Sequence, residues 1–557
     1  MRPSAFVCSP RVLLAGFGLL SLCLLPLACK SSAEQRAAAD KEVYGLVASR
    51  RTKLGFGGQT FTIEPNPDSL RQRILRKEVQ QLEPLDLARL LEIAAENSRD
   101  YQSNKEDLYL SALDLTLEHW RHSIETTNSI DAGVDGTGDG AQNANAGANL
   151  GFSKLFASGG TALFNMGTSM ARSLTFADGW HPVTDLGFNF TQPLLRGFGE
   201  RIVLETLTQA ERNLLYQVRD FERYRRTYAV DAAGRYYKLL QNMNVVENQE
   251  SNYKSLQQLT QRNEALAQAG RLSDIELGQA RQNELRSRDD LIAARARLDT
   301  QLDSLKVFLG LPPTFELGMD RSALEQLAGE KLAEEIPEEP ALSFALANRL
   351  DHQTVLDQFD DKKRKVLVAE DSLRTGLALE TQANATSKDG KPLQYNFRDV
   401  TWSATLTWNL PIDRLPERNA YRRSIVDLEA AGRQCANSQD TIEAGLRDEL
   451  RTMRTQLEGY QIQLLAVQLA ERRVESTKLL IDAGRASTRD LLESEDSLLS
   501  ARNSATSALI DYTLARLAVW RDLEILRVDS AGIHADAELL AKIESGDVNG
   551  PAKPAGG

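Results

Sequence analysis

The sequence is poor in aromatic residues and in the residue types that form metal and catalytic centres. Aromatic side chains make up 6% of the chain, and its 557 residues include 5 histidines and 4 cysteines. Three of the cysteines (Cys8, Cys23 and Cys29) lie near the N-terminus, so no disulfide framework is expected in a mature domain. Neither a Gly-x-Ser-x-Gly nor a His-Glu-x-x-His motif occurs. We therefore expect a protein that is not an enzyme and that needs no cofactor or metal.

Long basic blocks are also missing. Lys and Arg total 66 against 78 Asp and Glu, which gives a formal net charge of −12. Proteins that bind nucleic acids usually carry a basic surface, whereas basic runs here are as short as residues 223–226. We therefore predict no nucleic-acid partner.

An apolar run near the N-terminus predicts export from the cytoplasm. Residues 12–27 are apolar, two arginines precede them, and the run is too short for a comfortable membrane span. The following Ala28-Cys29 resembles a bacterial lipobox, in which Cys29 is diacylated, although Pro26 stands where such motifs usually have Leu. An ordinary signal cleaved near Ala28 or Ala33 is the alternative. We expect residues 1–28 to be a signal peptide and Cys29 to be lipidated, which would anchor the chain to a membrane.

The rest of the chain contains an internal repeat, in which one structural unit occurs twice. Segment 346–351 is similar to 95–100, and segment 484–490 is similar to 270–276. The spacing between matched segments falls by roughly 37 residues from the first match to the second. The first copy must therefore carry an insertion, which we place within residues 117–193.

Each copy is expected to contain a helix, extended segments, a long helix, a turn and a second long helix. The first repeat has its strand region at about 122–195 and the second at about 375–412. The parts of the chain after the signal are, in order, an N-terminal segment (29–84), the first repeat (85–312), a linker (313–340), the second repeat (341–526) and a flexible C-terminal tail (527–557).

A coiled-coil seam runs along one of the long helices. Its apolar residues alternate in steps of four and three, which makes a narrow stripe suited to supercoiling rather than a broad face for a globular core. The seam residues are Leu446, Leu450, Met453, Leu457, Tyr460, Leu464 and Val467. The long helices are therefore expected to need helical neighbours along their length.

Two-faced strands are predicted between the helices. Residues 186–190 and 406–410 alternate apolar and polar side chains. Ser158-Gly-Gly160 predicts a hairpin turn between two looser strands. The Gly/Asn-rich segment 131–151 is interpreted as a flexible loop, because its acidic residues do not have the spacing of an EF-hand calcium loop.

Four of the tryptophans lie near these strands. They are Trp120, Trp180, Trp402 and Trp408. Aromatic residues at strand ends are typical of a membrane-interface girdle, and ordinary sheet packing is the alternative. Two strands from each repeat give four per chain besides the inserted hairpin. Four strands cannot close a barrel, and open edges do not persist in hydrocarbon. If these strands enter a membrane, several chains must share them.

From residue 85 to 526 the chain resembles the TolC-like outer membrane efflux proteins. The resemblance rests on the doubled order of elements, on Ala-x-x-Asn in the Leu-rich opening helices, on Thr191-Gln-Pro-Leu-Leu195, on Ala-Gly-x-x-Ser at 269–273 and 483–487, and on Phe308-Leu-Gly310. It implies a fold that is mainly α with β: a duplicated helix–strand–helix unit with a long α-helical coiled-coil barrel, and four strands per chain in a shared trimeric β-barrel.

The same resemblance implies a function. The family forms homotrimeric, passive exit ducts for tripartite efflux or type I secretion, and its members meet a periplasmic adaptor protein and an inner-membrane pump. The chain would then lie in the cell outer membrane, lipid-anchored, with its helical part in the periplasm. The other possibility is a lipid-anchored periplasmic coiled-coil scaffold without channel activity, which would need neither the two-faced strands nor the tryptophans.

The turns between the paired long helices are the candidate functional sites. Each contains a glycine that can end a helix, an arginine, and a serine that can cap the returning helix. Local capping alone would produce this pattern, whereas the resemblance implies a gate or an adaptor-docking site. The candidate residues are Gly270, Arg271, Ser273, Asp274, Glu276, Gly484, Arg485, Ser487, Arg489 and Asp490.

Overall fold

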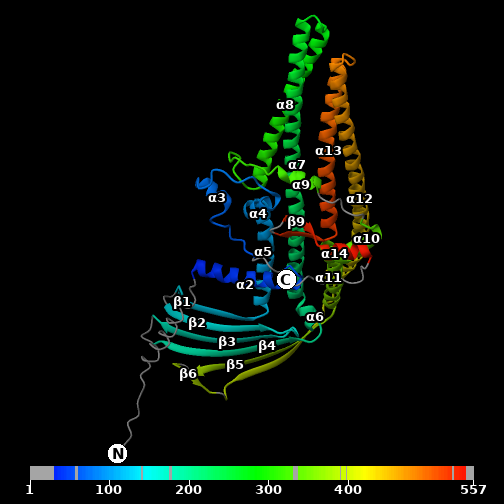
Figure 1. Cartoon of the computed structure of the whole chain (residues 1–557). Helices are drawn as coiled ribbons and strands as arrows, with labels where there is room; N and C mark the ends of the chain where they lie inside the picture. Colours follow the sequence, from blue (N-terminus) through cyan, green and yellow to red (C-terminus); the bar gives the residue numbers. More distant parts are fainter. Residues whose placement is uncertain are drawn as a thin grey trace, which may run out of the picture.

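Two helical hairpins and one β-sheet lie at opposite ends of the molecule (Figure 1). The structure is a computed structural model and describes residues 31–56, 61–138, 142–174, 179–329, 336–388, 390–396, 398–529 and 532–546. Cys29 and the signal segment lie outside these ranges. The hairpins are α7 (Glu205–Gln268) with α8 (Asp274–Phe308), and α12 (Leu415–Asp482) with α13 (Thr488–Asp522).

The two longest helices give the molecule its length. They contain 64 and 68 residues, and at 1.5 Å per residue each spans about 100 Å. The remaining helices are α2 (Ser32–Lys53), α3 (Leu70–Leu75), α4 (Leu87–Asn97), α5 (Arg99–Arg121), α6 (Glu200–Val203), α9 (Ser322–Gly329), α10 (Glu338–Asn348), α11 (Leu350–Ser372) and α14 (Ala537–Ser545). Within the described ranges, no helix combines the length and apolar character that a membrane span requires.

The order of elements follows the predicted duplication. In the first copy, α4 and α5 lead into strands and then into α7 and α8; in the second, α10 and α11 lead into strands and then into α12 and α13. Equivalent helices end in the same way. Gly310 follows α8 with φ +70°, and a Cβ there would collide with the Asn97 carbonyl, so this position requires glycine.

One core of the molecule is rich in aromatic side chains. Tyr101 on α5 lies near Phe221 and Tyr228 on α7, with ring centroids 6.0 and 5.4 Å apart, and Tyr228 stacks on Phe308 at 5.0 Å. Fully buried leucines such as Leu108 surround them. This core lies where α5 and the end of α8 pack against α7.

The predicted seam on α12 is buried over its first half. Leu446, Met453 and Tyr460 are 0%, 7% and 5% exposed. The first two share a core with Tyr512 on α13, and Tyr460 shares one with Leu509 on the same helix. Beyond this region Leu464 is 41% exposed. The seam on α12 is therefore only partly buried within one chain.

Strands β1 to β7 form one antiparallel sheet in the order β1-β2-β3-β4-β5-β6, with β7 also pairing with β5. The strands are β1 (Ile124–Gly136), β2 (Gln142–Leu155), β3 (Thr161–Ser173), β4 (His181–Pro193), β5 (Gly376–Lys388), β6 (Lys391–Tyr395) and β7 (Thr401–Asn409). Since β6 is short, six long strands remain. Four of them are the strands expected from the two repeats, and the inserted part of the first copy adds the other two.

The inserted part is the β1–β2 hairpin. Strands β3 and β4 precede α7 as β5 and β7 precede α12, so β1 and β2 have no counterpart in the second copy. The interpretation of residues 131–151 as a flexible loop is wrong. Ile124 pairs with Lys154 and Gly136 pairs with Gln142 without a register shift between them, and ladder hydrogen bonds compensate for the low strand propensity of Gly, Asn and Ala.

The expected flexible tail is also partly structured. Strands β8 (Leu526–Asp529) and β9 (Gly532–Ala535) form a hairpin, and α14 follows. Ile543 on α14 is fully buried in the core that includes Phe344 on α10. Apolar residues in a polar tail thus hold α14 against the second repeat.

Candidate functional site

Each helical hairpin turns through the same backbone motif. Gly270 and Gly484 both have φ +70°, the left-handed conformation that glycine adopts without strain. The amide of Arg271 donates to the Leu266 carbonyl at 2.9 Å, and the amide of Arg485 donates to the Leu480 carbonyl at 2.8 Å. Hydrogen bonds from an amide to the carbonyl five residues earlier at a helix end are typical of a Schellman motif.

The returning helices α8 and α13 begin with capping boxes. The Ser273 hydroxyl accepts the Glu276 amide at 3.3 Å, and the Glu276 carboxylate accepts the Ser273 amide at 3.4 Å. Ser487 and Asp490 repeat this arrangement at 3.3 and 2.8 Å. The predicted capping roles of the two serines are confirmed, and Glu276 and Asp490 contribute to the same caps.

Hydrogen bonds also set the charge at the second tip. The Ser487 backbone amide and hydroxyl hold the pKa of the exposed Asp490 carboxyl below its usual range, with a smaller contribution from Arg489. Asp490 is therefore a fixed negative charge in the first turn of α13, where the helix dipole favours it.

The other charged tip residues are exposed to solvent. Arg271, Asp274, Arg485 and Arg489 all lie on the surface of the turns. In the described parts of the chain, no hydrogen bond or ion pair involves the side chain of Arg271 or Arg485. The tips thus present these charges to solvent.

The two tips are joined to one another by contacts that the sequence does not reveal. Asn263 on α7 donates to the Thr488 hydroxyl at the start of α13 at 3.1 Å, and Arg262 pairs with Asp482 on α12 at 2.7 Å. An apolar cluster supports them, formed by Leu256, Leu259, Leu491 and Leu492. The partners lie in different repeats at unequal distances from the glycines, so repeat symmetry gives no signal.

A second set of ion pairs joins the repeats near the middle of the molecule. Arg223 on α7 contacts Glu524 at 2.9 Å and Asp522 at 3.4 Å. Arg349 contacts Asp522 at 3.1 Å, and Arg226 also pairs with Glu524. The basic run 223–226 is therefore neutralised by carboxylates inside the chain.

Glu524 occupies an unusual backbone position. It follows α13 with φ +59°, where the equivalent position after α8 is Gly310. A non-glycine residue in this region is strained by about 1 kcal/mol. Its side chain is 6% exposed and pairs with both Arg223 and Arg226. The ion pairs thus keep Glu524 in a backbone conformation that a glycine adopts at the equivalent position of the first repeat.

A carboxyl with a raised pKa lies beside this network. Burial, with a further contribution from the Asp522 charge, raises the pKa of Glu449 on α12 to about 7. Arg521 contacts Glu449 at 3.1 Å and opposes this effect. Glu449 is thus a group whose charge changes near neutral pH.

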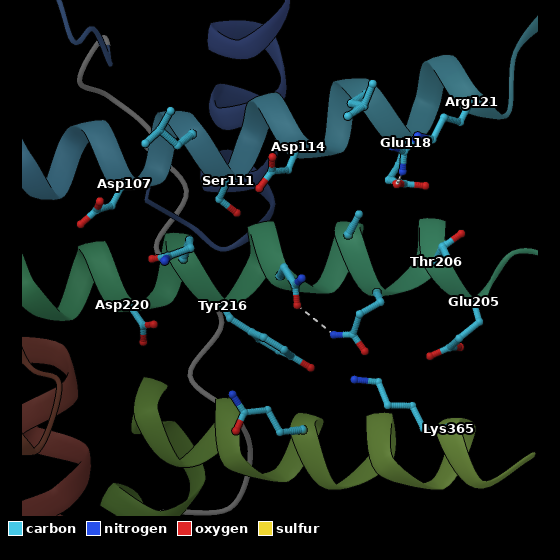
Figure 2. A pocket seen from close by; sticks show the side chains of 17 residues that line it. Asp107, Ser111, Asp114, Glu118, Arg121, Glu205, Thr206, Tyr216, Asp220 and Lys365 are labelled. Atoms are coloured by element: carbon cyan, nitrogen blue, oxygen red, sulfur yellow. Dashed lines mark hydrogen bonds and ion pairs between the residues drawn. The ribbon is translucent and has the colours of Figure 1, made fainter. Parts of the chain in front are cut away.

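A groove of about 910 Å³ lies between α5, α7 and α11. Figure 2 shows carboxylates entering it from α5 and α7, with a lysine on α11 facing them. They are Asp107, Asp114, Glu118, Glu205 and Asp220, with Lys365 opposite. Within the described ranges, no three His, Cys, Asp or Glu side chains lie where they could hold one metal ion together. The nearby His122 ring nitrogen Nδ1 contacts the Glu118 carbonyl at 2.9 Å, which is local packing.

The long strands of the sheet have one apolar and one polar face. Directly paired residues share a face, and the register aligns Phe164 with Phe188 and Leu379 with Leu406. Trp402 and Trp408 lie on this apolar face and are 78% and 63% exposed. At about 3.3 Å per residue they stand about 20 Å apart along β7.

Solved structures share this fold. No family model matches the sequence, and no curated protein matches it. The outer-membrane channel OprN is 15% identical at a TM-score of 0.58, over 82% of this chain and 92% of that one.

Two further channels give the same result. The Campylobacter jejuni outer membrane channel CmeC is 15% identical at a TM-score of 0.57, over 83% of this chain and 89% of that one. The Vibrio cholerae outer membrane protein VceC is 15% identical at a TM-score of 0.56, over 78% and 95%. The expected fold class, a TolC-like helical barrel with a β domain, is therefore confirmed.

Proposed function

Starting from this shared fold, we propose that the protein is a passive outer-membrane exit duct of a tripartite efflux or type I secretion system. Three copies would share one β-barrel in the outer membrane, and their helical hairpins would form a tunnel through the periplasm. The duct performs no chemical step. Cargo would be driven through it by an inner-membrane pump.

The observation that carries the proposal is the two-faced sheet with free edges at one end of long helices. The outer strands β1 and β7 expose apolar side chains such as Ile130 and Trp402, at 68% and 78%. Apolar surface of this extent suits a lipid environment. Unpaired strand edges do not persist in hydrocarbon, so the edges need further copies of the chain.

The hairpin tips are the proposed contact with the adaptor. They lie at the end of the molecule opposite the sheet (Figure 1), where a partner from the inner membrane would arrive. Arg271 and Arg485 expose charges there, on turns whose backbone is fixed by capping. In a trimer, Asp274 and Asp490 would add rings of negative charge that favour cations and repel anions at the entrance.

Lipidation of Cys29 is part of the same proposal. Helix α2 begins at Ser32, so an acylated Cys29 would attach the anchor just before the first described helix. Changing Cys29→Ser should remove the acyl mass from the purified protein and reduce its membrane retention. An unchanged intact mass would instead support an ordinary signal peptide.

The test is to isolate the protein from outer membranes and reconstitute it in planar bilayers. We expect a homotrimer by native mass spectrometry, with discrete conductance steps that are missing from membranes lacking the gene. A monomeric periplasmic protein without conductance would refute the duct and favour the coiled-coil scaffold.

A further inference from the structure

The β1–β2 hairpin extends the sheet by two strands. Strand β2 pairs with β3 over its length, from Leu155 opposite Thr161 to Asn143 opposite Ser173. β1 contains 13 residues and β2 contains 14, while about 9 to 11 residues suffice to cross a membrane. The hairpin is therefore long enough to be part of a transmembrane wall.

The two faces of the sheet also continue through the hairpin. Ile124, Ile130 and Val134 on β1 are 62%, 68% and 70% exposed. The register places them on the same face as Phe152 on β2, and so on the same face as Phe164 on β3. The apolar surface thus extends from β7 to β1.

The polar face follows one construction throughout. Glycines on this face pair directly with a polar residue of the next strand, whose side chain occupies the space above the glycine. The pairs are Thr127 with Gly151, Asp131 with Gly147, Gly133 with Asn145, Asn149 with Gly167, and Asn165 with Gly187. Since three of these pairs lie between β1 and β2, the hairpin has the same wall structure as the strands that follow.

Six long strands leave two free edges of opposite direction. Each neighbouring pair from β1 to β7 is antiparallel, so β7 of one copy can pair with β1 of the next in the same antiparallel manner. A cyclic arrangement of copies then closes without a parallel or unpaired edge.

We propose that the shared barrel contains six strands per protomer, with β1 of each copy pairing with β7 of the next. This rests on the proposed trimeric duct and goes beyond it: the barrel has eighteen strands rather than the twelve implied by the resemblance. At about 4.8 Å between strands and a tilt near 40°, eighteen strands give a diameter of about 36 Å against about 24 Å for twelve. The backbone wall at the outer mouth would therefore be about one and a half times as wide.

Cysteine cross-linking distinguishes the two barrels. In a Cys435→Ser background, Ser403→Cys on the polar face of β7 is combined with single cysteines at polar-face positions of β1, namely Glu125, Thr127, Ser129 and Asp131. A parallel series combines Ser403→Cys with polar-face positions of β3, namely Leu163, Asn165 and Ser169. The two series are matched, because β3 becomes the edge strand if the hairpin lies outside the barrel.

We expect at least one β1 position to give covalent dimers and trimers in intact outer membranes, and no β3 position to do so. Cross-links only from β3, or none from either strand while the protein remains a trimer, would overturn the eighteen-stranded barrel and leave the duct standing. A cross-linked band that remains monomeric would overturn it as well, because the chain would have closed on itself. Absence of a trimer in the unsubstituted protein would refute the duct itself.

Counting strands in the trimer by electron cryo-microscopy gives an independent answer. Eighteen strands are expected, and a barrel of twelve with the hairpin outside its wall would contradict the proposal even if a β1 cross-link forms.

Discussion

Asn263 on the first helical hairpin donates a hydrogen bond to the Thr488 hydroxyl on the second, at 3.1 Å and with both side chains buried. This contact joins the two repeats within a few residues of their tips. Arg262 and Asp482 form an ion pair beside it, but their side chains are 43% and 63% exposed. The buried hydrogen bond is therefore the firmer of the two connections.

Removing this connection should let the hairpins separate. Asn263→Ala leaves the buried Thr488 hydroxyl without its donor, which costs about 1–3 kcal/mol. Combined with Arg262→Ser, it should raise the fraction of time that reconstituted channels conduct. The control is Asn248→Ala, which removes a similar α7–α13 hydrogen bond to Asn503, at 2.9 Å, farther from the tips. Equal conductance changes in both variants would contradict a special role for the tip contact.

Reversing the exposed tip arginines should impair export. Arg271→Glu or Arg485→Glu changes a surface charge without touching the capping hydrogen bonds, so trimer yield should be unchanged. A penalty of about 1.4 kcal/mol at an adaptor contact weakens binding about tenfold. Export of a transported compound, measured beside trimer yield, tests this. Arg297→Glu, an exposed change along α8, is the matched control, and unchanged export in the tip variants would argue against docking there.

Replacing Glu524 should destabilise the chain even though its backbone is strained. Glu524→Gly relieves about 1 kcal/mol of strain, but it removes the buried carboxylate that pairs with Arg226 and leaves Arg223 with Asp522, which costs about 3–5 kcal/mol. The thermal midpoint of the detergent-solubilised protein should fall. Glu538→Gln removes a surface pair with Lys542, in which the glutamate is 75% exposed, and should change little. A rise in the midpoint of Glu524→Gly would show that strain outweighs the ion pairs.

The raised pKa of Glu449 predicts a pH dependence of stability. Its pKa rises from the model-peptide value of 4.5 to about 7 on folding, so the folded state favours the protonated form. The resulting stabilisation is complete below about pH 4.5 and is lost as the pH rises through about 7. Its size should be on the order of 1 kcal/mol after solvent screening.

Glu449→Gln stays neutral and should flatten this part of the stability profile. Thermal midpoints measured between about pH 5 and pH 8 test the difference. Asp448→Asn, at a carboxylate that is 76% exposed, should retain the slope of the parent. A parent profile that does not fall across this range would contradict the assignment of Glu449.

Local features of the fold are well predicted from the sequence. The caps at Ser273 and Ser487 depend on residues three positions apart, and the start of the α12 seam depends on a regular spacing from Leu446 onward. Both kinds of signal lie within a few helical turns, so the chain shows them directly.

Long-range features escaped prediction for the opposite reason. The hairpin strands contain Gly, Asn and Ala, which have low strand propensity, and their order comes from a ladder such as Ile130 opposite Ala148. Ion pairs such as Arg223 with Glu524 join residues 301 positions apart. Pairing in space, rather than local pattern, decides such contacts.

The glycines on the polar face of the sheet determine how a substitution there would alter that face. Above Gly147 lies the Asp131 carboxylate, and above Gly133 lies the Asn145 amide. A larger side chain at either glycine would displace its neighbour away from the sheet, toward the space that the proposed barrel would enclose. Each pair is therefore a place where one substitution alters the chemistry of the interior surface while the ladder beneath it keeps its register.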